Sequence, residues 1–391
     1  MTFERPFATR VADLQPFRTL ALLSQAQARI KAGRDVIRLD VGEPDFGTPE
    51  PVLAAARQAL DAGVGRYTEA IGRPALREAI AASYQQRYGV TIAPSRILVT
   101  TGSSAGLMLL VSALLNAGDT ILSAAPGYPS HPVFASVANG NVTALKSAEP
   151  GRLWPTAAEY DAAWTEHTRA LLIASPSNPT GSVIDWEDAK ALMDLAKSKN
   201  AAYISEELYH GLSFDSPDRS ALEHSDDVFV INGFSKYFGM TGWRLGWLIV
   251  PEAYVDVITM LAQHLYLSPP DISQAAALAC FTDETIAICE ARRQTFASRR
   301  DLLLPRLEDA GFKIPYPAQG GLFIFADASR FTRQSYVFAQ ALLEQADVSI
   351  APGIDFGDFD AFMRFSLCTR AERLEEAMDR IVGFLAKRGG V

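Results

Sequence analysis

The chain has 391 residues, of which 48% are hydrophobic and 21% charged, and it carries a net charge of −9 at pH 7 with a pI of about 5.2. A chain of this length can bury a large core and is expected to hold about two domains. Because the excess charge is negative and the basic residues form no runs, we expect neither a nucleic acid nor an anionic membrane as a partner. A small molecule is the favoured ligand.

The three cysteines are Cys280, Cys289 and Cys368, and they form neither a CxxC pair nor a metal-ligand spacing. Their odd number argues against a disulfide framework, so we expect reduced cysteines and no metal site. The N-terminal segment is charged and lacks the apolar stretch of a signal peptide, and no later segment offers about eighteen uninterrupted apolar residues. These features predict a cytoplasmic protein.

The first half of the chain begins with apolar residues at helical spacing over 14–31, followed by Gly33 as a stop and a short strand at 35–41. The Gly- and Pro-rich run GEPDFGTPEP then predicts a loop between domains. Beyond predicted helices at 51–62 and 73–88, strands and helices alternate. The strands are expected at 97–100, 120–123, near 142, near 170, at 201–205, from 228 and at 243–250, and the helices at 104–116, from 129 and at 186–199. This alternation predicts an α/β fold, a three-layer α/β/α domain with a mostly parallel sheet.

The rest of the chain opens with predicted helices at 252–263, 273–281 and 284–311, the last long enough to connect two domains. A smaller α+β unit follows, with strands at 322–325, 348–350 and 363–367 and helices at 334–345 and 371–385. Since the first helix and strand lack partners of their own, we expect them to pack against this unit. The predicted domains are therefore an N-terminal arm with part of the small domain (1–45), a large domain (46–283) and a small C-terminal domain (284–391).

Two apolar runs within 228–250 flank a polar turn that holds Lys236 and, eight positions on, Arg244. A lysine fixed between two core strands tends to have a lowered pKa or a covalent partner, and both suit a nucleophilic amine. The arginine could hold a phosphate near that amine. The plain alternative is that both are ordinary exposed charges.

Other polar groups follow the predicted strands. The turn VTTGSSAGL directs the backbone N–H groups of Gly102, Ser103 and Ser104 towards one spot that would suit a phosphate, although a tight turn with a serine cap fits equally well. Tyr128, between two prolines, could form a flat stacking wall or pack in the core. Asn178 precedes Pro179 and has an amide free to donate.

Glu206 and Tyr209 stand at another strand end, where a carboxylate could keep a ring nitrogen protonated and a phenol could hold an adjacent oxygen. Either could also be a surface group. Taken together, all these groups follow the carboxyl ends of strands, which is where sheets of this type bind ligands. The combination suits a phosphorylated aldehyde on an aromatic heterocycle.

The sequence resembles the class I and II aminotransferases, which are fold type I enzymes that use pyridoxal 5'-phosphate. The resemblance covers nearly the whole chain through ten segments in order: GEPDFGTP, RYTEAIG, TTGSSAG, PGYP, SNPTG, SEELYHG, FSKYFGMTGWRLG, GGLFIF, APGIDFG and MRFSLC. Each segment alone is weak, but ten in sequence are specific. The family fold has a large cofactor-binding domain and a smaller domain.

The resemblance implies a role for each matching residue. Lys236 would bind the cofactor aldehyde covalently, and Tyr209 and Glu206 would complete the catalytic set. Cofactor contacts are implied for Gly102, Ser103, Ser104 and Arg244 at the phosphate, Tyr128 on the ring face, Asn178 and Tyr209 at the ring oxygen, and Glu206 at the ring nitrogen. Gly42, Asn178 and Arg364 would bind the substrate. Tyr67 would reach the phosphate of a neighbouring subunit, which implies a homodimer with shared active sites.

Two departures from the family pattern concern the cofactor. Glu206 stands where the family usually has aspartate, so the ring, the strand end or the side chain must adjust, while the carboxylate still supplies the charge. Gly233 stands where relatives often place a phosphate-binding serine, and Ser235 is the candidate to replace it.

The predicted activity is a ping-pong transamination between an L-amino acid and a 2-oxo acid. Some relatives supply a cation for a distal carboxylate from the segment that matches Gln263 to Pro270. No Lys or Arg occurs here from Glu252 to Glu290, so we expect an apolar or aromatic substrate unless Arg10, Arg18 or His131 enters the site. A carbon–sulfur β-lyase on the same fold is the main alternative. A transcription-regulator effector domain is disfavoured by the absence of a preceding DNA-binding module, and a nucleotide-binding oxidoreductase by the absence of GxGxxG.

Overall fold

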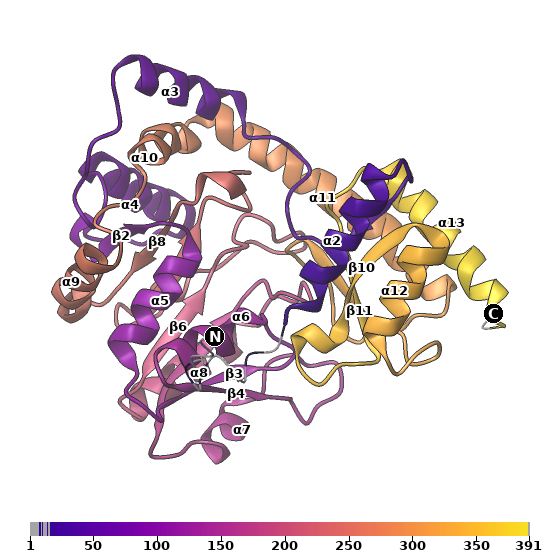
Figure 1. The fold of residues 1–391 in the computed structure, drawn as a ribbon. Coiled ribbons are helices and arrows are strands. Elements are labelled where there is room, and N and C mark those ends of the chain that lie inside the picture. Colours follow the sequence, from indigo (N-terminus) through magenta and orange to yellow (C-terminus); the bar gives the residue numbers. More distant parts are fainter. Residues whose placement is uncertain (1–7, 9, 11–13, 15, 390–391) are drawn as a thin grey trace, which may run out of the picture.

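The computed structural model describes residues 8, 10, 14 and 16–389 of the chain. Two β-sheets organise it, one of seven strands and one of four. Figure 1 shows the larger sheet with its helices on one side of the molecule and the smaller sheet, with the C-terminus, on the other. None of the helices in these residues is long and apolar enough to cross a membrane.

The seven-stranded sheet has the order β2-β8-β7-β6-β5-β3-β4. Its strands are β2 (Ile97–Thr100), β3 (Thr120–Ala124), β4 (Asn141–Leu145), β5 (Thr168–Ala174), β6 (Ala202–Glu206), β7 (Phe229–Gly233) and β8 (Gly246–Ile249). Only β8 runs antiparallel to its neighbours. The prediction of a mostly parallel sheet is therefore confirmed.

Helices cover both faces of this sheet, because side chains that alternate along its buried strands enter two separate apolar layers. Phe229 and Ile231 of β7 pack with α5 (Ser103–Leu114), α6 (Ser130–Val137) and α9 (Val255–Leu265), whereas Val230 faces the layer of α4 (Pro74–Tyr88) and α8 (Trp186–Ser198). The remaining helices of this part are α3 (Glu50–Asp61), α7 (Ala157–Ala162) and α10 (Asp271–Ala277). The predicted three-layer α/β/α architecture is confirmed.

The four-stranded sheet has the order β1-β10-β11-β9, formed by β1 (Ile37–Leu39), β9 (Phe323–Asp327), β10 (Val348–Pro352) and β11 (Phe362–Ser366). β1 pairs parallel with β10, and α2 (Arg18–Lys31) packs beside it with α12 (Ser335–Ala346) and α13 (Ala371–Lys387). The expectation that the first helix and strand join the C-terminal unit is confirmed. The exact boundaries 1–45, 46–283 and 284–391 stay a prediction, and part of 1–45 lies outside the described residues.

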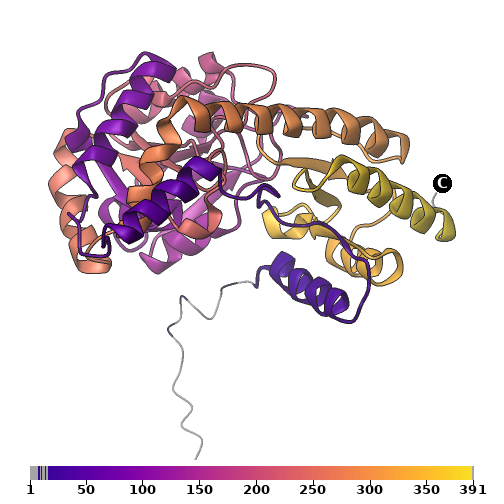
Figure 2. The same cartoon turned by 90° about the horizontal axis from the view of Figure 1, so that it is seen from above.

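The long helix α11 (Asp283–Asp309) runs from the large sheet to the small one, as Figure 2 shows. Its Arg299 forms a two-pronged ion pair with Asp45 in the GEPDFG loop and also donates to the carbonyl of Leu367 beyond β11. This arginine therefore ties the helix to the loop between the two sheets and to the small unit. These contacts hold the loop in place beside both sheets.

Several elements differ from the sequence prediction. The first helix begins at Arg18 rather than at residue 14, and part of that interval lies outside the described residues. The strand predicted at 243–250 begins only at Gly246, because Trp243 closes a short 3-10 turn and Arg244 has a left-handed backbone (φ 52°). Helix α7 has no counterpart in the sequence prediction; its start is fixed by a Thr156–Glu159 capping box.

Candidate active site

A cavity of about 340 Å³ opens where the carboxyl ends of the parallel strands face the four-stranded sheet. Most of the residues singled out in the sequence line it: Gly42, Ser103, Ser104, Tyr128, Asn178, Glu206, Tyr209, Ser235, Lys236, Arg244 and Arg364. Gly102 lies next to the lining. Tyr67 does not line the cavity, and its side chain is 81% exposed on the connector between α3 and α4.

Lys236 follows β7 and points its amine into this cavity. Its Nζ donates a hydrogen bond to the carbonyl oxygen of Gly42 at 2.8 Å. Burial lowers the pKa of the lysine below its ordinary 10.5, and the positive charges of Arg364 and Arg244 act in the same direction. The amine is consequently easier to deprotonate than an exposed lysine and is better suited to nucleophilic attack.

The turn between β2 and α5 forms an open cradle. Gly102 has a φ of +85°, and a Cβ at this position would lie 2.7 Å from Arg244 Nη2, so only glycine allows the guanidinium to approach. No side chain caps the start of α5, which leaves its first backbone N–H groups available to a ligand. The alternative of a serine cap is therefore wrong. Arg244 itself is exposed, and its Nη1 donates to the carbonyl of Thr241 at 2.9 Å.

Glu206 is the last residue of β6, and its carboxylate lies 2.8 Å from His131 Nε2. Both side chains are buried, and the His131 ring stands edge-on to Tyr128 with centroids 5.3 Å apart. His131 therefore contacts two residues of the cavity lining, Glu206 and Tyr128, but does not line the cavity itself. The option that this histidine supplies a cation for a distal substrate group is not supported by that position.

Tyr209 lies one turn beyond Glu206 and packs edge-on against Phe323, with ring centroids 6.1 Å apart. Burial raises the pKa of the phenol far above 10. The hydroxyl therefore stays protonated at neutral pH and can donate a hydrogen bond into the cavity.

Arg364 is only 3% exposed, and its guanidinium forms no ion pair with a carboxylate in the described part of the chain. Nη1 donates to Asn178 Oδ1 at 2.9 Å and Nη2 to the carbonyl of Asp40 at 2.6 Å, while Nε has no partner. The guanidinium lies 3.9 Å from the ring centroid of Phe323, and burial lowers its pKa to about 10. A buried cation held in this way is ready to receive an anionic ligand.

The sequence analysis missed several residues of the site. Phe323 packs under both Gly42 and Arg364, and the segment GGLFIF was its only signal. Phe17, just before the first helix, and Leu20 within it line the cavity, because Asp355 of the small unit accepts hydrogen bonds from the backbone of Arg18 and Thr19. No local pattern announces a contact between residues more than 330 positions apart.

The other predicted candidates lie elsewhere. Arg18 approaches Asp355 at 3.8 Å, and Arg10 is exposed. The three cysteines form no disulfide; Cys280 and Cys289 are buried as expected, but Cys368 is only partly buried. None of the described residues forms a cluster suited to a metal ion.

The family described as "Aminotransferase class I and II" matches residues 34–381, which is most of the chain. The chain belongs to this family. It is accordingly a transaminase with the fold type I architecture. A crystal structure of an aminotransferase from Mycobacterium tuberculosis superposes on it with a TM-score of 0.94 at 38% identity, covering 98% of this chain and all of that one.

Two curated relatives bear on the aminotransferase's substrate. A valine–pyruvate aminotransferase of Mycobacterium tuberculosis is 38% identical over 96% of this chain and 97% of its own length. An aspartate/prephenate aminotransferase of Thermus thermophilus is 34% identical over 98% of this chain and all of its own length. The relatives thus share a reaction type and differ in the amino acids that their names give.

Proposed function

We propose that this aminotransferase binds pyridoxal 5'-phosphate in the cavity, with Lys236 as the residue that joins the cofactor aldehyde. The observation that carries the proposal is a partly buried amine with a lowered pKa beside an uncapped helix N-terminus and the exposed guanidinium of Arg244. The space above Gly102, where a side chain would collide with Arg244, fits a phosphate held by backbone N–H groups. The residues present therefore fit the group.

In this assignment Gly102, Ser103, Ser104, Ser235 and Arg244 hold the phosphate. Tyr128 covers the ring face. The Asn178 amide, whose oxygen is taken by Arg364, has its Nδ2 left to donate, and the Tyr209 hydroxyl donates beside it to the ring oxygen. Glu206, fixed by His131, supplies the negative charge at the ring nitrogen.

When bound, the cofactor acts as an electron sink that stabilises negative charge at the substrate α-carbon. The chain's own residues bind the substrate and move the proton. Arg364 clamps the α-carboxylate with its two outer nitrogens, close to the Gly42 backbone, and so orients the α-carbon towards Lys236 Nζ. That amine then serves as general base and general acid for the α-proton.

A ping-pong order follows from the number of carboxylate clamps. Arg364 is the one buried guanidinium that lines the cavity within the described residues, so an amino acid and a 2-oxo acid would occupy the same place in turn. Initial rates measured at several fixed concentrations of the second substrate should give parallel double-reciprocal lines. Intersecting lines would contradict this order.

The substrate proposed here is an apolar or aromatic L-amino acid. Phe17 and Leu20 contribute apolar surface to the cavity, and the carboxylate of Glu43 in the same lining is negative. The name of the valine–pyruvate relative agrees with an apolar donor. A panel of amino acids against pyruvate, 2-oxoglutarate and glyoxylate tests it, and saturation by micromolar aspartate without any response to valine, leucine or phenylalanine would overturn it.

The β-lyase alternative has a separate assay. Cystathionine offered without any 2-oxo acid should give no pyruvate beyond a trace if the protein is a transaminase. Sustained release of pyruvate and thiol without an acceptor would show that elimination is the main reaction.

The covalent assignment is tested with Lys236→Ala. This variant should lose transamination by about 10⁴-fold or more, because it lacks both the covalent nucleophile and the proton carrier. In the wild type, borohydride reduction followed by peptide mass spectrometry should place the cofactor on Lys236. A label on any other side chain, or normal turnover by the variant, would refute the assignment.

A further inference from the structure

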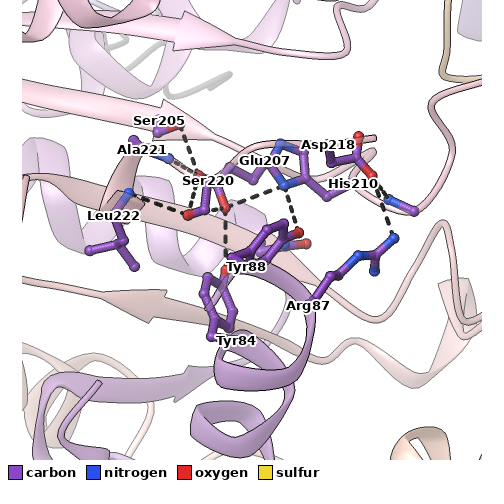
Figure 3. Close-up of polar contacts among 12 residues, drawn as sticks. Tyr84, Arg87, Tyr88, Ser205, Glu207, His210, Asp218, Ser220, Ala221 and Leu222 are labelled. Atoms are coloured by element: carbon purple, nitrogen blue, oxygen red, sulfur yellow. Dashed lines mark hydrogen bonds and ion pairs between the residues drawn. The ribbon is translucent and has the colours of Figure 1, made fainter. Parts of the chain in front are cut away.

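Directly behind the site, the carboxylate of Glu207 is buried with 1% exposure in a network of donors, drawn in Figure 3. Its Oε1 accepts hydrogen bonds from the hydroxyl of Ser220 at 2.9 Å, the backbone N–H of Ala221 at 3.0 Å and the hydroxyl of Ser205 at 3.2 Å. Its Oε2 accepts from the hydroxyl of Tyr84 at 3.3 Å. The donors converge on a group that, when ionised, only accepts hydrogen bonds.

His210 belongs to the same network. Its Nδ1 lies 3.5 Å from Glu207 Oε2 and 2.9 Å from the hydroxyl of Tyr88. Tyr84 in turn accepts a hydrogen bond from the Trp247 indole at 3.4 Å. The network therefore joins β6, the C-terminal end of α4, strand β8 and the segment around Ser220.

The segment Glu206–Leu212 presents two faces. Glu206 and Tyr209 face the cavity, whereas Glu207 and His210 face the network behind it. The two members of each pair are three residues apart and share a face, whereas the neighbours Glu206 and Glu207 lie on opposite faces. Backbone bonds from Glu207 N to the carbonyl of Ile231 and from His210 N to the carbonyl of Glu207 make the turn compact.

We infer that Glu207 and His210 are positioning residues, which fix Glu206 and Tyr209 at the distances that the cofactor ring requires. The inference rests on the proposed function, since it concerns the two side chains assigned to the ring nitrogen and the ring oxygen. Because both pairs share one short compact segment, a shift of the buried pair moves the cavity pair with it.

The buried carboxylate of Glu207 is not expected to add much to the free energy of unfolding. Burial raises the pKa of Glu207 against the lowering effect of its donors and of His210, so the site bears a cost of desolvation. Apolar residues of similar volume often replace buried charged groups without loss of stability. A fully hydrogen-bonded polar network, in contrast, selects one backbone position among several that an apolar contact would tolerate.

The test compares Glu207→Gln with Asp119→Asn. Asp119 is another buried carboxylate, held by the backbone N–H of Asn116 at 2.8 Å and by Arg169 at 3.1 Å. It lies just before the amino-terminal end of β3, whereas the cavity lies beyond the carboxyl ends of the parallel strands. Both variants are expected to lower the melting temperature. Affinity for pyridoxal 5'-phosphate and the pH midpoint of its absorbance when bound are measured for each.

Glu207→Gln should weaken cofactor binding about tenfold. Without its network the segment Glu206–Leu212 is less ordered in the free protein, and ordering it on binding costs part of the binding free energy. The absorbance midpoint should move to higher pH, because a displaced Tyr209 no longer stabilises the deprotonated ring oxygen. Asp119→Asn should change neither quantity. If Glu207→Gln fails to fold, Ser220→Ala decides, since it removes one donor and should give smaller changes in the same direction.

Wild-type affinity and an unmoved midpoint in Glu207→Gln, or in Ser220→Ala where the first does not fold, would overturn the inference and leave the proposed function intact. Equal weakening by Asp119→Asn would also overturn it, because the effect would then follow from general destabilisation. Failure of the wild type to bind the cofactor would instead refute the proposed function.

Discussion

The charged amine of Lys236 is partly removed from water in the cavity, and this desolvation makes the stability of the cofactor-free protein depend on pH. Burial lowers the pKa of Lys236 in the folded protein below its ordinary value of 10.5. At pH values between these two, the folded protein binds fewer protons than the unfolded chain, so stability rises with pH across that window. Below the lowered pKa the full penalty remains.

Replacing this lysine by an apolar side chain should therefore stabilise the cofactor-free protein at neutral pH. We expect the free energy of unfolding of Lys236→Met to exceed that of the wild type by about 1.4 kcal/mol for each unit by which the pKa is lowered. The advantage should shrink as the pH approaches 10.5. Chemical denaturation of both apoproteins at several pH values measures it, and a difference that stays constant with pH would contradict the prediction.

Arg364 and Arg244 give a matched pair of substitutions, because the two guanidiniums are assigned to different ligands. Arg364→Lys loses the two-pronged contact to the substrate carboxylate, so kcat/KM should fall about 100-fold while cofactor affinity changes little. Arg244→Lys should mainly weaken binding of the cofactor. Steady-state kinetics and cofactor titration of both variants separate the two roles; the reverse pattern would exchange the assignments.

At the level of residues, the sequence predicted those site members that lie in short polar turns after strands. Lys236, Asn178 and Tyr209 belong to this class, Glu206 is the last residue of a strand, and the structure brings all four to one cavity. Phe323 and Leu20 escaped because an apolar side chain in an apolar segment looks like core. Their positions depend on how the two sheets face each other, which no local pattern contains.

The same limit applies to elements. Alternating strands and helices predicted the large sheet, since periodicity and turn residues are local properties. The start of α2 was misplaced because its first N–H groups are capped from another part of the fold: Asp355 accepts from the backbone N–H of Thr19 at 2.8 Å and from its hydroxyl at 2.7 Å. The break before β8 was missed because it depends on the left-handed backbone of Arg244.

This remote cap gives a prediction for the helix. Asp355→Ala should lower the free energy of unfolding by about 1–2 kcal/mol, the usual cost of removing a helix N-cap with a further hydrogen bond. Since α2 carries Leu20 at the cavity mouth, KM for an apolar amino acid should rise more than kcat falls. Thr19→Val, which removes only the side-chain donor, is the milder control. Unchanged stability in both variants would show that α2 is held by packing alone.

For the whole molecule, Tyr67 is 81% exposed and does not line the cavity of its own chain, so the phosphate contact that the family resemblance implies for it would need a second copy. Large apolar side chains are exposed nearby in the chain and on α9 and the turn that follows it: Leu60, Val257, Met260, Leu265 and Leu267. Such a surface is typical of an interface with a second copy. We propose a homodimer in which Tyr67 enters the partner subunit's cavity. The cytoplasmic location also stays a prediction.

Mixed dimers test the sharing of residues directly. Lys236→Ala and Tyr67→Ala subunits are each expected to be poorly active alone. If Tyr67 acts across the interface, a dimer of one subunit of each kind contains one intact site, formed by the lysine of the second subunit and the tyrosine of the first. Random exchange should then restore about a quarter of the wild-type sites.

If Tyr67 instead served its own subunit, every site in the mixed dimer would lack either the lysine or the tyrosine. Activity would then never exceed the mean of the two parent variants at any mixing ratio. Dissociation and reassociation of the two proteins, with activity followed against the mixing ratio and dimer formation checked by light scattering, distinguishes the arrangements. Each variant taken alone through the same dissociation and reassociation supplies the baseline. Recovery above that baseline requires both exchange of subunits and a site built from two chains.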